Sequence, residues 1–217
     1  MPNLIIDIKP SRTYSAFIEA PFDKGKGALE KKGYSVISLK ENALLRIQEG
    51  QVSFISQNGN WTREGAIYVP SKGRFLTKNS PIMANAQEAT NCHRKNQEFC
   101  LTDAQVEESL ADSVKLSGHS IPTNRFAEDP VTVYAFEEFV EQYGQFLKNA
   151  GIKEMPVLLA DLQEKPFARQ LWFHRLICGD CSGLNGSYED LGYDDWVRGV
   201  RQGGKATAKN LGLVGKL

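Results

Sequence analysis

The stretch of residues 174–195 limits what this chain can fold into more than any other part of it. It contains small, polar and aromatic residues and almost no strong helix formers, and two apolar segments, residues 171–173 and 196–197, flank it. Residues of this kind are typical of turns and contact loops. We therefore expect buried segments on both sides that hold a long irregular region between them.

Composition and charge narrow the possible classes of protein. The chain has 217 residues, of which 41% are hydrophobic, and 26 basic residues balance 26 acidic ones. Zero net charge gives no reason to expect a nucleic-acid partner. No apolar run approaches the roughly 20 residues that span a bilayer, so we expect no membrane insertion. We expect one domain, residues 1–217, as a monomer.

The N-terminal part, residues 1–80, is predicted to be rich in strands. Short runs of β-branched and aromatic residues, separated by turn residues, predict strands at residues 34–39, 52–56, 66–69 and 74–77. The alternation in residues 1–10 also predicts a strand and not a signal peptide. Asn58-Gly59 predicts a hairpin turn, because type I′ turns need positive φ at both central positions. One helix around Leu44 is expected to end at Gly50.

Two further helices are predicted in the middle of the chain. Thr102 and Gln105 form a capping box, and Val106, Leu110 and Val114 would share one face of the helix that follows. A second helix would begin after Pro130 and end at Gly151. Its broad apolar stripe would comprise Phe136, Phe139, Val140, Tyr143 and Leu147. A short strand is expected at residues 157–159.

The four cysteines suggest metal or redox chemistry only weakly. Cys178 and Cys181, with His174, would supply half of a zinc site, and Cys92, His93 and Cys100 would have to supply the rest. A second Cys-x-x-Cys is missing, so we predict no metal site and no cofactor. Asp190, Asp194 and Asp195 match no calcium loop, and solvated loop acids are the simpler interpretation.

Two kinds of residue alternate through the unusual stretch and its flanking segments. The first kind can be buried or can form turns: Trp172, Leu176, Leu184, Leu191, Trp196, Val197 and Val200, with Gly183, Gly186 and Gly199. The second kind consists of candidate ligand contacts: His174, Ile177, Cys178, Gly179, Asp180, Cys181, Asn185, Ser187, Tyr188, Gly192, Tyr193, Asp194 and Asp195. An asparagine codon encodes His, Asp, Tyr, Ser, Ile, Gly or Cys when only its adenines change.

This pattern resembles the variable region of diversity-generating retroelement proteins, and the archaeal members most of all. The resemblance covers residues 167–201, including Leu-Trp-Phe-His-Arg-Leu and Ser-Gly-Leu-Asn-Gly-Ser-Tyr-Glu-Asp-Leu-Gly-Tyr-Asp-Asp-Trp-Val-Arg-Gly-Val-Arg. In that family a reverse transcriptase copies a template repeat with errors at adenines, and the copy replaces the end of the target gene. The variable region often ends the protein, whereas residues 202–217 follow it here.

The resemblance implies an α+β C-type lectin fold, in the variant of formylglycine-generating enzymes, with a strand-rich N-terminal elaboration. It also implies a binding protein without catalysis, whose ligand is a macromolecule, in the simplest case a protein, and display on a cell or virion surface. An alternative is a zinc-stabilised or cysteine-dependent enzyme of the same fold that uses Cys178 and Cys181. Those cysteines would then be indispensable, whereas adenine mutagenesis would replace them in sister genes.

Overall fold

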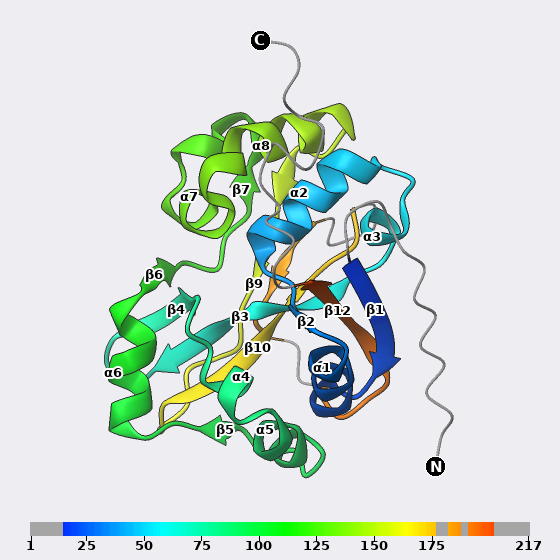
Figure 1. Cartoon of the computed structure of the whole chain (residues 1–217). Coiled ribbons are helices and arrows are strands. Elements are labelled where there is room, and N and C mark those ends of the chain that lie inside the picture. The colour runs from blue at the N-terminus through cyan, green and yellow to red at the C-terminus, as the bar shows by residue number, and fades with distance from the viewer. Residues whose placement is uncertain (1–14, 177–181, 188–190, 202–217) are drawn as a thin grey trace.

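A mixed β-sheet runs through the molecule, and helices pack on both of its faces (Figure 1). The computed structural model describes residues 15–176, 182–187 and 191–201. Within them the main sheet has the strand order β1-β12-β3-β10-β11-β9, with β2 beside β12, β4 and β6 beyond β3, and β5 beside β10. Two short strands, β7 and β8, form a separate ribbon.

The described strands are β1 (Ser15–Ala20), β2 (Tyr34–Val36), β3 (Asn60–Val69), β4 (Gly73–Thr77), β5 (Phe99–Cys100), β6 (Ser113–Leu116), β7 (Ile121–Pro122), β8 (Glu154–Met155), β9 (Val157–Leu158), β10 (Phe167–Phe173), β11 (Leu184–Asn185) and β12 (Asp195–Arg201). The α-helices are α1 (Phe22–Lys31), α2 (Leu39–Glu49), α3 (Phe54–Gln57), α4 (Pro81–Ala84), α5 (Ala86–His93), α6 (Asp103–Ala111), α7 (Pro130–Phe136) and α8 (Val140–Asn149). Two 3₁₀ segments, η1 (Thr123–Glu128) and η2 (Glu137–Phe139), flank α7.

The central strands β3 and β10 face two separate hydrophobic cores. Along β10, Phe167, Leu171 and Phe173 pack into the core that also holds α2, α7 and α8. Ala168 and Trp172 point the other way, into the core shared with α1, α5 and α6. Successive strand side chains point to opposite faces, so a strand covered on both faces is buried along its whole length.

The N-terminal and C-terminal parts of the chain lie in the same sheet. Strand β12 pairs antiparallel with β1, where Ser15 lies opposite Val200, and parallel with β3, where Val197 lies opposite Trp61. Strand β10 pairs antiparallel with β3 on its other side. The unusual stretch therefore begins and ends on strands that the N-terminal part of the chain holds in place.

Several predicted elements are confirmed. Helix α6 begins at Thr102 with both capping-box hydrogen bonds to Gln105, at 3.3 and 3.0 Å. Helix α2 ends at Gly50, whose φ of 87° favours glycine. The predicted strands at residues 66–69 and 74–77 lie in β3 and β4, and β9 corresponds to the strand expected at residues 157–159.

Other predictions about the N-terminal part were wrong. The strand expected at residues 34–39 ends at Val36, and α2 begins at Leu39. Residues 52–56 contribute to α3 and not to a strand. Asn58-Gly59 forms no hairpin, since Asn58 has a φ of −123°. A Cβ atom at position 59 would lie 2.6 Å from the Trp172 ring, so close packing is what requires the glycine.

The middle helices also differ from expectation. Val114 does not continue the face of α6, because the helix ends at Ala111 and Val114 belongs to β6. The helix expected between Pro130 and Gly151 is divided into α7 and α8 at Glu137, whose φ is 50°. The strand expected within residues 1–10 lies outside the described residues.

Candidate ligand-binding surface

The apolar residues of the unusual stretch form its buried frame, as the sequence predicted. The structure buries Trp172, Leu176, Leu184, Leu191 and Val197, and the most exposed of these, Trp172, shows only 8% of its surface. Trp196 and Val200, on β12 between β1 and β3, are half-buried. Leu176 and Leu184 belong to one of the two cores, and Trp172, Leu191 and Val197 belong to the other.

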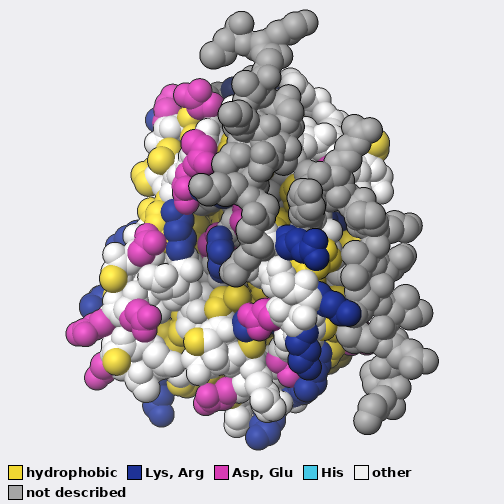
Figure 2. Space-filling view, viewed as in Figure 1, with side chains coloured by type: hydrophobic (Ala, Val, Ile, Leu, Met, Phe, Trp, Pro, Cys, Tyr) yellow, Lys and Arg dark blue, Asp and Glu magenta, His cyan; other side chains and the backbone are white. Residues whose placement is uncertain are grey.

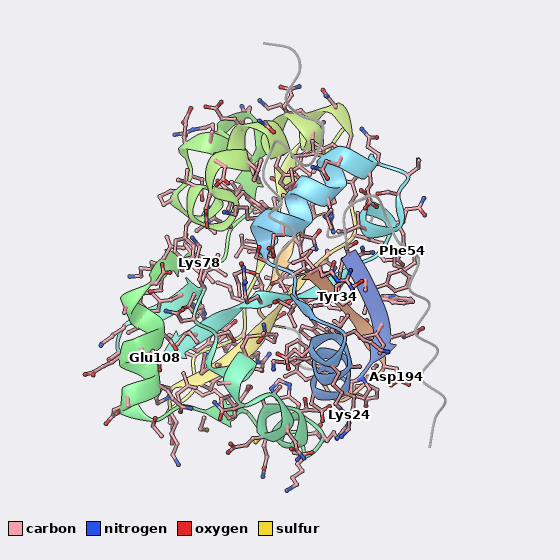
Figure 3. All side chains as sticks on the ribbon, viewed as in Figure 1. Lys24, Tyr34, Phe54, Lys78, Glu108 and Asp194 are labelled. Atoms are coloured by element: carbon pink, nitrogen blue, oxygen red, sulfur yellow. The ribbon has the colours of Figure 1, made fainter. Side chains whose placement is uncertain are left out.

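The candidate contact residues that the structure describes range from exposed to buried. Tyr193 is 70% exposed and Asp194 is also exposed, whereas His174, Ser187, Gly192 and Asp195 are half-buried. Figure 3 shows Asp194 near α1 and the end of β1, where β12 begins. The remaining candidates lie outside the described residues, and their placement stays a prediction: Ile177, Cys178, Gly179, Asp180, Cys181 and Tyr188.

Asn185 differs from the other described candidates because it is buried, with 6% of its surface exposed. Its Nδ2 atom lies 3.1 Å from His174 Nε2, and its Oδ1 accepts hydrogen bonds from the backbone and hydroxyl of Ser187, both at 2.8 Å. The side chain thus links two half-buried candidates from behind. It has little surface to offer a ligand directly.

A buried arginine holds the base of the loop between β10 and β11. Arg46 of α2 is 0% exposed and donates to the carbonyl of His174 at 2.7 Å and to Ser182 Oγ at 3.2 Å. It also donates to Tyr143 Oη at 3.1 Å, and its guanidinium lies 4.1 Å from the centroid of the Phe173 ring. These contacts tie both ends of the loop to α2.

Backbone hydrogen bonds close the same loop. The amide of His174 donates to the Gly183 carbonyl at 3.0 Å, and that of Ser182 donates to the Arg175 carbonyl at 2.8 Å. The amide of Leu176 donates to Ser56 of α3 at 2.6 Å. The loop thus leaves the sheet from a fixed base, while its central residues lie outside the described part of the chain.

A second buried arginine holds the segment after β11. Arg169 of β10 is 4% exposed; it donates to Glu98 Oε2 from Nε at 3.1 Å, to Glu98 Oε1 and to the Ser187 carbonyl. Tyr68 Oη donates to the carbonyl of Gly186 at 2.8 Å. The backbone beside Ser187 is therefore fixed, and its side chain can change without loss of these bonds.

Neither arginine was expected from the sequence, although a signal for one of them was present. Arg169 lies in the otherwise mostly apolar run of residues 167–173, and a charged residue there needs a partner when it is buried. Arg46 follows Leu44 and Leu45 in a helix, where a charge usually lies on the solvated face. Nothing in the sequence indicates that this arginine points inward.

The described residues give little support to metal or thiol chemistry. No group of three or more His, Cys, Asp or Glu side chains in residues 15–176, 182–187 and 191–201 is placed to hold a metal ion. Burial, together with the nearby charge of Glu88, raises the pKa of the Cys92 thiol, which disfavours the reactive thiolate. Cys178 and Cys181 lie outside the described residues, so the zinc or cysteine-dependent alternative stays a prediction.

The charge on the viewed face is mixed. Figure 2 shows basic and acidic side chains interspersed among polar and hydrophobic ones. Among the described residues, no helix is both long enough and apolar enough to cross a bilayer. On this face the described side chains therefore create no broad electrostatic potential of a single sign.

Comparison with known proteins gives the fold. No protein-family model and no curated protein matches the sequence. The structure is similar to a solved protein structure from Nanoarchaeota that is described as accommodating massive sequence variation by the C-type lectin fold. The TM-score is 0.65 with 17% sequence identity, over 89% of this chain and 97% of the other. The chain therefore has an α+β architecture with the C-type lectin fold, as the resemblance of residues 167–201 implied.

Proposed function

We propose that this chain is a ligand-binding protein that displays exchangeable side chains on a C-type lectin scaffold. The observation that carries the proposal is the separation of the two kinds of residue in one stretch. Leu176, Leu184 and Leu191 are at most 1% exposed, whereas Tyr193 is 70% exposed. Replacing an exposed side chain such as that of Tyr193 or Asp194 leaves the volume of the core unchanged.

The similar structure from Nanoarchaeota supports the proposal, because the same fold accommodates massive sequence variation there. In our proposal, adenine-directed mutagenesis from a retroelement produces the variation within residues 167–201. Arg46 and Arg169 support it further. Arg46 holds the loop between β10 and β11 through the His174 carbonyl, and Arg169 holds the segment after β11 through the Ser187 carbonyl. A carbonyl is present whichever side chain is encoded.

The proposed ligand is a macromolecule, in the simplest case a protein. Tyr193 would be its aromatic anchor, since Tyr and Trp residues dominate contact energies at interfaces. Ser187, Asp194 and Asp195 would add adaptable polar contacts, as in antibody paratopes. Recognition of this kind needs no catalytic group, and we propose that the chain has no activity of its own. Display on a cell or virion surface would bring the site to its ligand.

The proposal is tested with two libraries of the full chain. One library varies His174, Ser187, Tyr193 and Asp194 among the residues that an asparagine codon reaches through changes at its adenines. The matched control library introduces the same set of amino acids at the buried positions Leu176, Leu184 and Leu191. Both are sorted for resistance to proteolysis, and the survivors are panned against purified test proteins.

We expect most members of the first library to fold and some to bind their targets. Substitutions at exposed positions such as Tyr193 and Asp194 usually change stability by less than about 0.5 kcal/mol. The half-buried His174 and Ser187 are held through their backbone carbonyls, which every side chain keeps. The control library should be mostly unfolded, since each buried leucine that is lost costs about 2–5 kcal/mol. Widespread unfolding in the first library would show that these positions belong to the frame. Folding without any binder would argue against recognition.

A further inference from the structure

A hollow lies beside the exposed part of the segment that leads into β12. Its volume is about 240 Å³; Gly192 and Tyr193 line one side, and the connection from α5 to β5 lines the other. We call residues 94–98 of that connection the fixed wall, because they lie outside the 167–201 region in which variation is proposed. The lining residues of the fixed wall are Arg94, Asn96, Gln97 and Glu98.

Backbone hydrogen bonds determine the shape of the fixed wall. The amide of Asn96 donates to the His93 carbonyl at 2.9 Å, and that of Gln97 donates to the Cys92 carbonyl at 3.0 Å. Asn96 adopts a φ of 55°, a left-handed conformation that asparagine tolerates better than most residues. Strand β5 follows immediately and pairs with β10. The wall is thus formed before any ligand arrives.

Direct contact connects the fixed wall to the segment of proposed variation. A Cβ atom at Gly192 would lie 2.6 Å from Arg94 Cγ, so the Arg94 side chain packs directly against the backbone of Gly192. Arg169 joins Glu98 of the wall to the carbonyl of Ser187. A ligand that contacts Tyr193 would therefore meet the fixed wall as well.

The fixed wall presents an arginine that no described carboxylate neutralises. Arg94 is exposed and forms no ion pair with a carboxylate of the described residues; its guanidinium donates to Asn91 Oδ1 at 3.4 Å. The carboxylate of Glu98, in contrast, is already engaged by Arg169 and by Gln163 Nε2 at 3.0 Å. The hollow thus has a guanidinium available for an anion.

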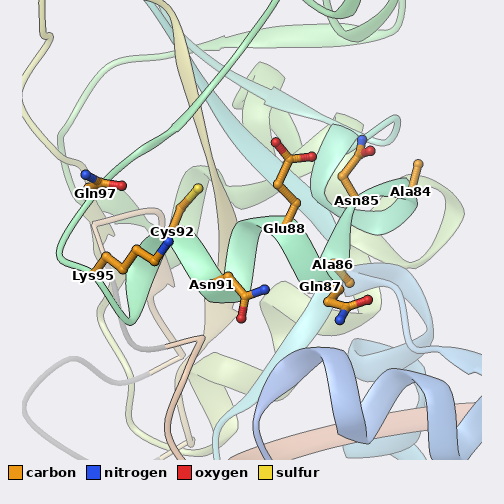
Figure 4. Close-up of a pocket in the computed structure, with 9 residues that line it drawn as sticks. All are labelled: Ala84, Asn85, Ala86, Gln87, Glu88, Asn91, Cys92, Lys95 and Gln97. Carbon is orange, nitrogen blue, oxygen red and sulfur yellow. The ribbon is translucent and has the colours of Figure 1, made fainter.

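The polar surface continues beyond this hollow. Gln97 also lines a second, open hollow of about 600 Å³ that runs along α4 and α5. Figure 4 shows Gln97, Lys95 and Cys92 at one end of it and Asn85 at the other. An extended segment bound beside Tyr193 would find amide groups, a second cation, Lys95, and one carboxylate, Glu88, along its path.

We propose that the binding site has a constant half: the fixed wall binds a carboxylate side chain from an acidic segment of the protein ligand, beside Tyr193. This inference rests on the proposed function. Arginine suits the role, because its planar guanidinium pairs with a carboxylate through two parallel hydrogen bonds. Residues of the diversified segment then select among acidic ligands that the constant half has already favoured.

The test uses a display library of the full chain that varies Ser187, Tyr193, Asp194 and Asp195. It is panned against an immobilised glutamate-rich peptide and, separately, against the peptide in which every glutamate is glutamine. Each binder obtained is then remade with Arg94→Gln. The matched control is Arg125→Gln, because Arg125 is an exposed arginine on η1 that contributes nothing to the hollow. Thermal unfolding of every variant confirms that it is folded.

We expect the glutamate peptide to yield more binders than the glutamine peptide. Arg94→Gln should lower the affinity of each binder for the glutamate peptide by roughly tenfold or more, as the loss of a charge-assisted hydrogen bond does. Arg125→Gln should leave affinity unchanged. Binders that tolerate Arg94→Gln, or that do not distinguish the two peptides, would overturn the constant half and leave the proposed function standing. If neither peptide yields a binder, recognition itself is contradicted.

Discussion

Replacing Arg169 with methionine should destabilise the chain strongly. Arg169 is 4% exposed, and its guanidinium holds Glu98 and the Ser187 carbonyl. Methionine fills much of the same space but leaves both acceptors without their donor. Removing one partner of a buried ion pair costs about 3–5 kcal/mol. We expect the free energy of unfolding to fall by about 3 kcal/mol, at the lower end of that range, because the Glu98 side chain is 14% exposed and keeps its hydrogen bond from Gln163.

Urea unfolding followed by tryptophan fluorescence measures this loss of stability. A double-mutant cycle with Glu98→Gln measures the interaction energy between Arg169 and Glu98. The double variant should be more stable than the sum of the single effects predicts, with a coupling of about 1–3 kcal/mol. A loss below about 1 kcal/mol with no coupling would mean that the pair behaves like a surface salt bridge. Arg169 would then not fix the segment around Ser187.

Three further predictions concern stability. Burial raises the pKa of Glu64 from 4.5 to about 7, so the folded chain holds this proton more tightly and loses stability as the pH rises through that interval. Glu64→Gln should remove the decline and be more stable than the native chain by about 3 kcal/mol at pH 8, which urea titrations across pH would detect or refute. Gly186→Ala should lower the melting temperature and cost about 1–3 kcal/mol, because its Cβ atom would lie 2.7 Å from that of Ala66; an unchanged melting temperature would contradict the close packing. Thr102→Ala should cost about 1 kcal/mol in denaturant unfolding through the loss of the α6 cap, whereas Thr102→Ser should cost much less.

The sequence predicted best where local chemistry decides the structure. The capping box at Thr102 and the helix end at Gly50 depend on neighbouring residues alone, and both are present. The buried frame of the unusual stretch was also predicted. Burial of an apolar side chain such as Leu184 or Leu191 is favourable because it removes apolar surface from water.

Prediction failed where contacts distant in sequence decide. Helix α1 was not expected, since it contains Gly25 and Gly27, which are poor helix formers; Gly25 is accommodated because it packs directly against Val197 of β12. Gly59 was interpreted as a turn residue, yet the Trp172 ring is what requires it. The fixed wall gave no signal either, because Arg94 becomes part of a hollow only when the fold brings Tyr193 beside it.

The DNA downstream of this gene offers the most direct test of the central claim, that the chain is a diversified binding protein. Sequencing should find a near-copy of the segment that encodes residues 167–201, beside a gene for a reverse transcriptase. The copy should differ from the gene at template adenines and should keep the codons of the buried frame, such as those of Leu176, Leu184 and Val197. Absence of any repeat, or differences spread evenly over buried and exposed positions, would contradict the account.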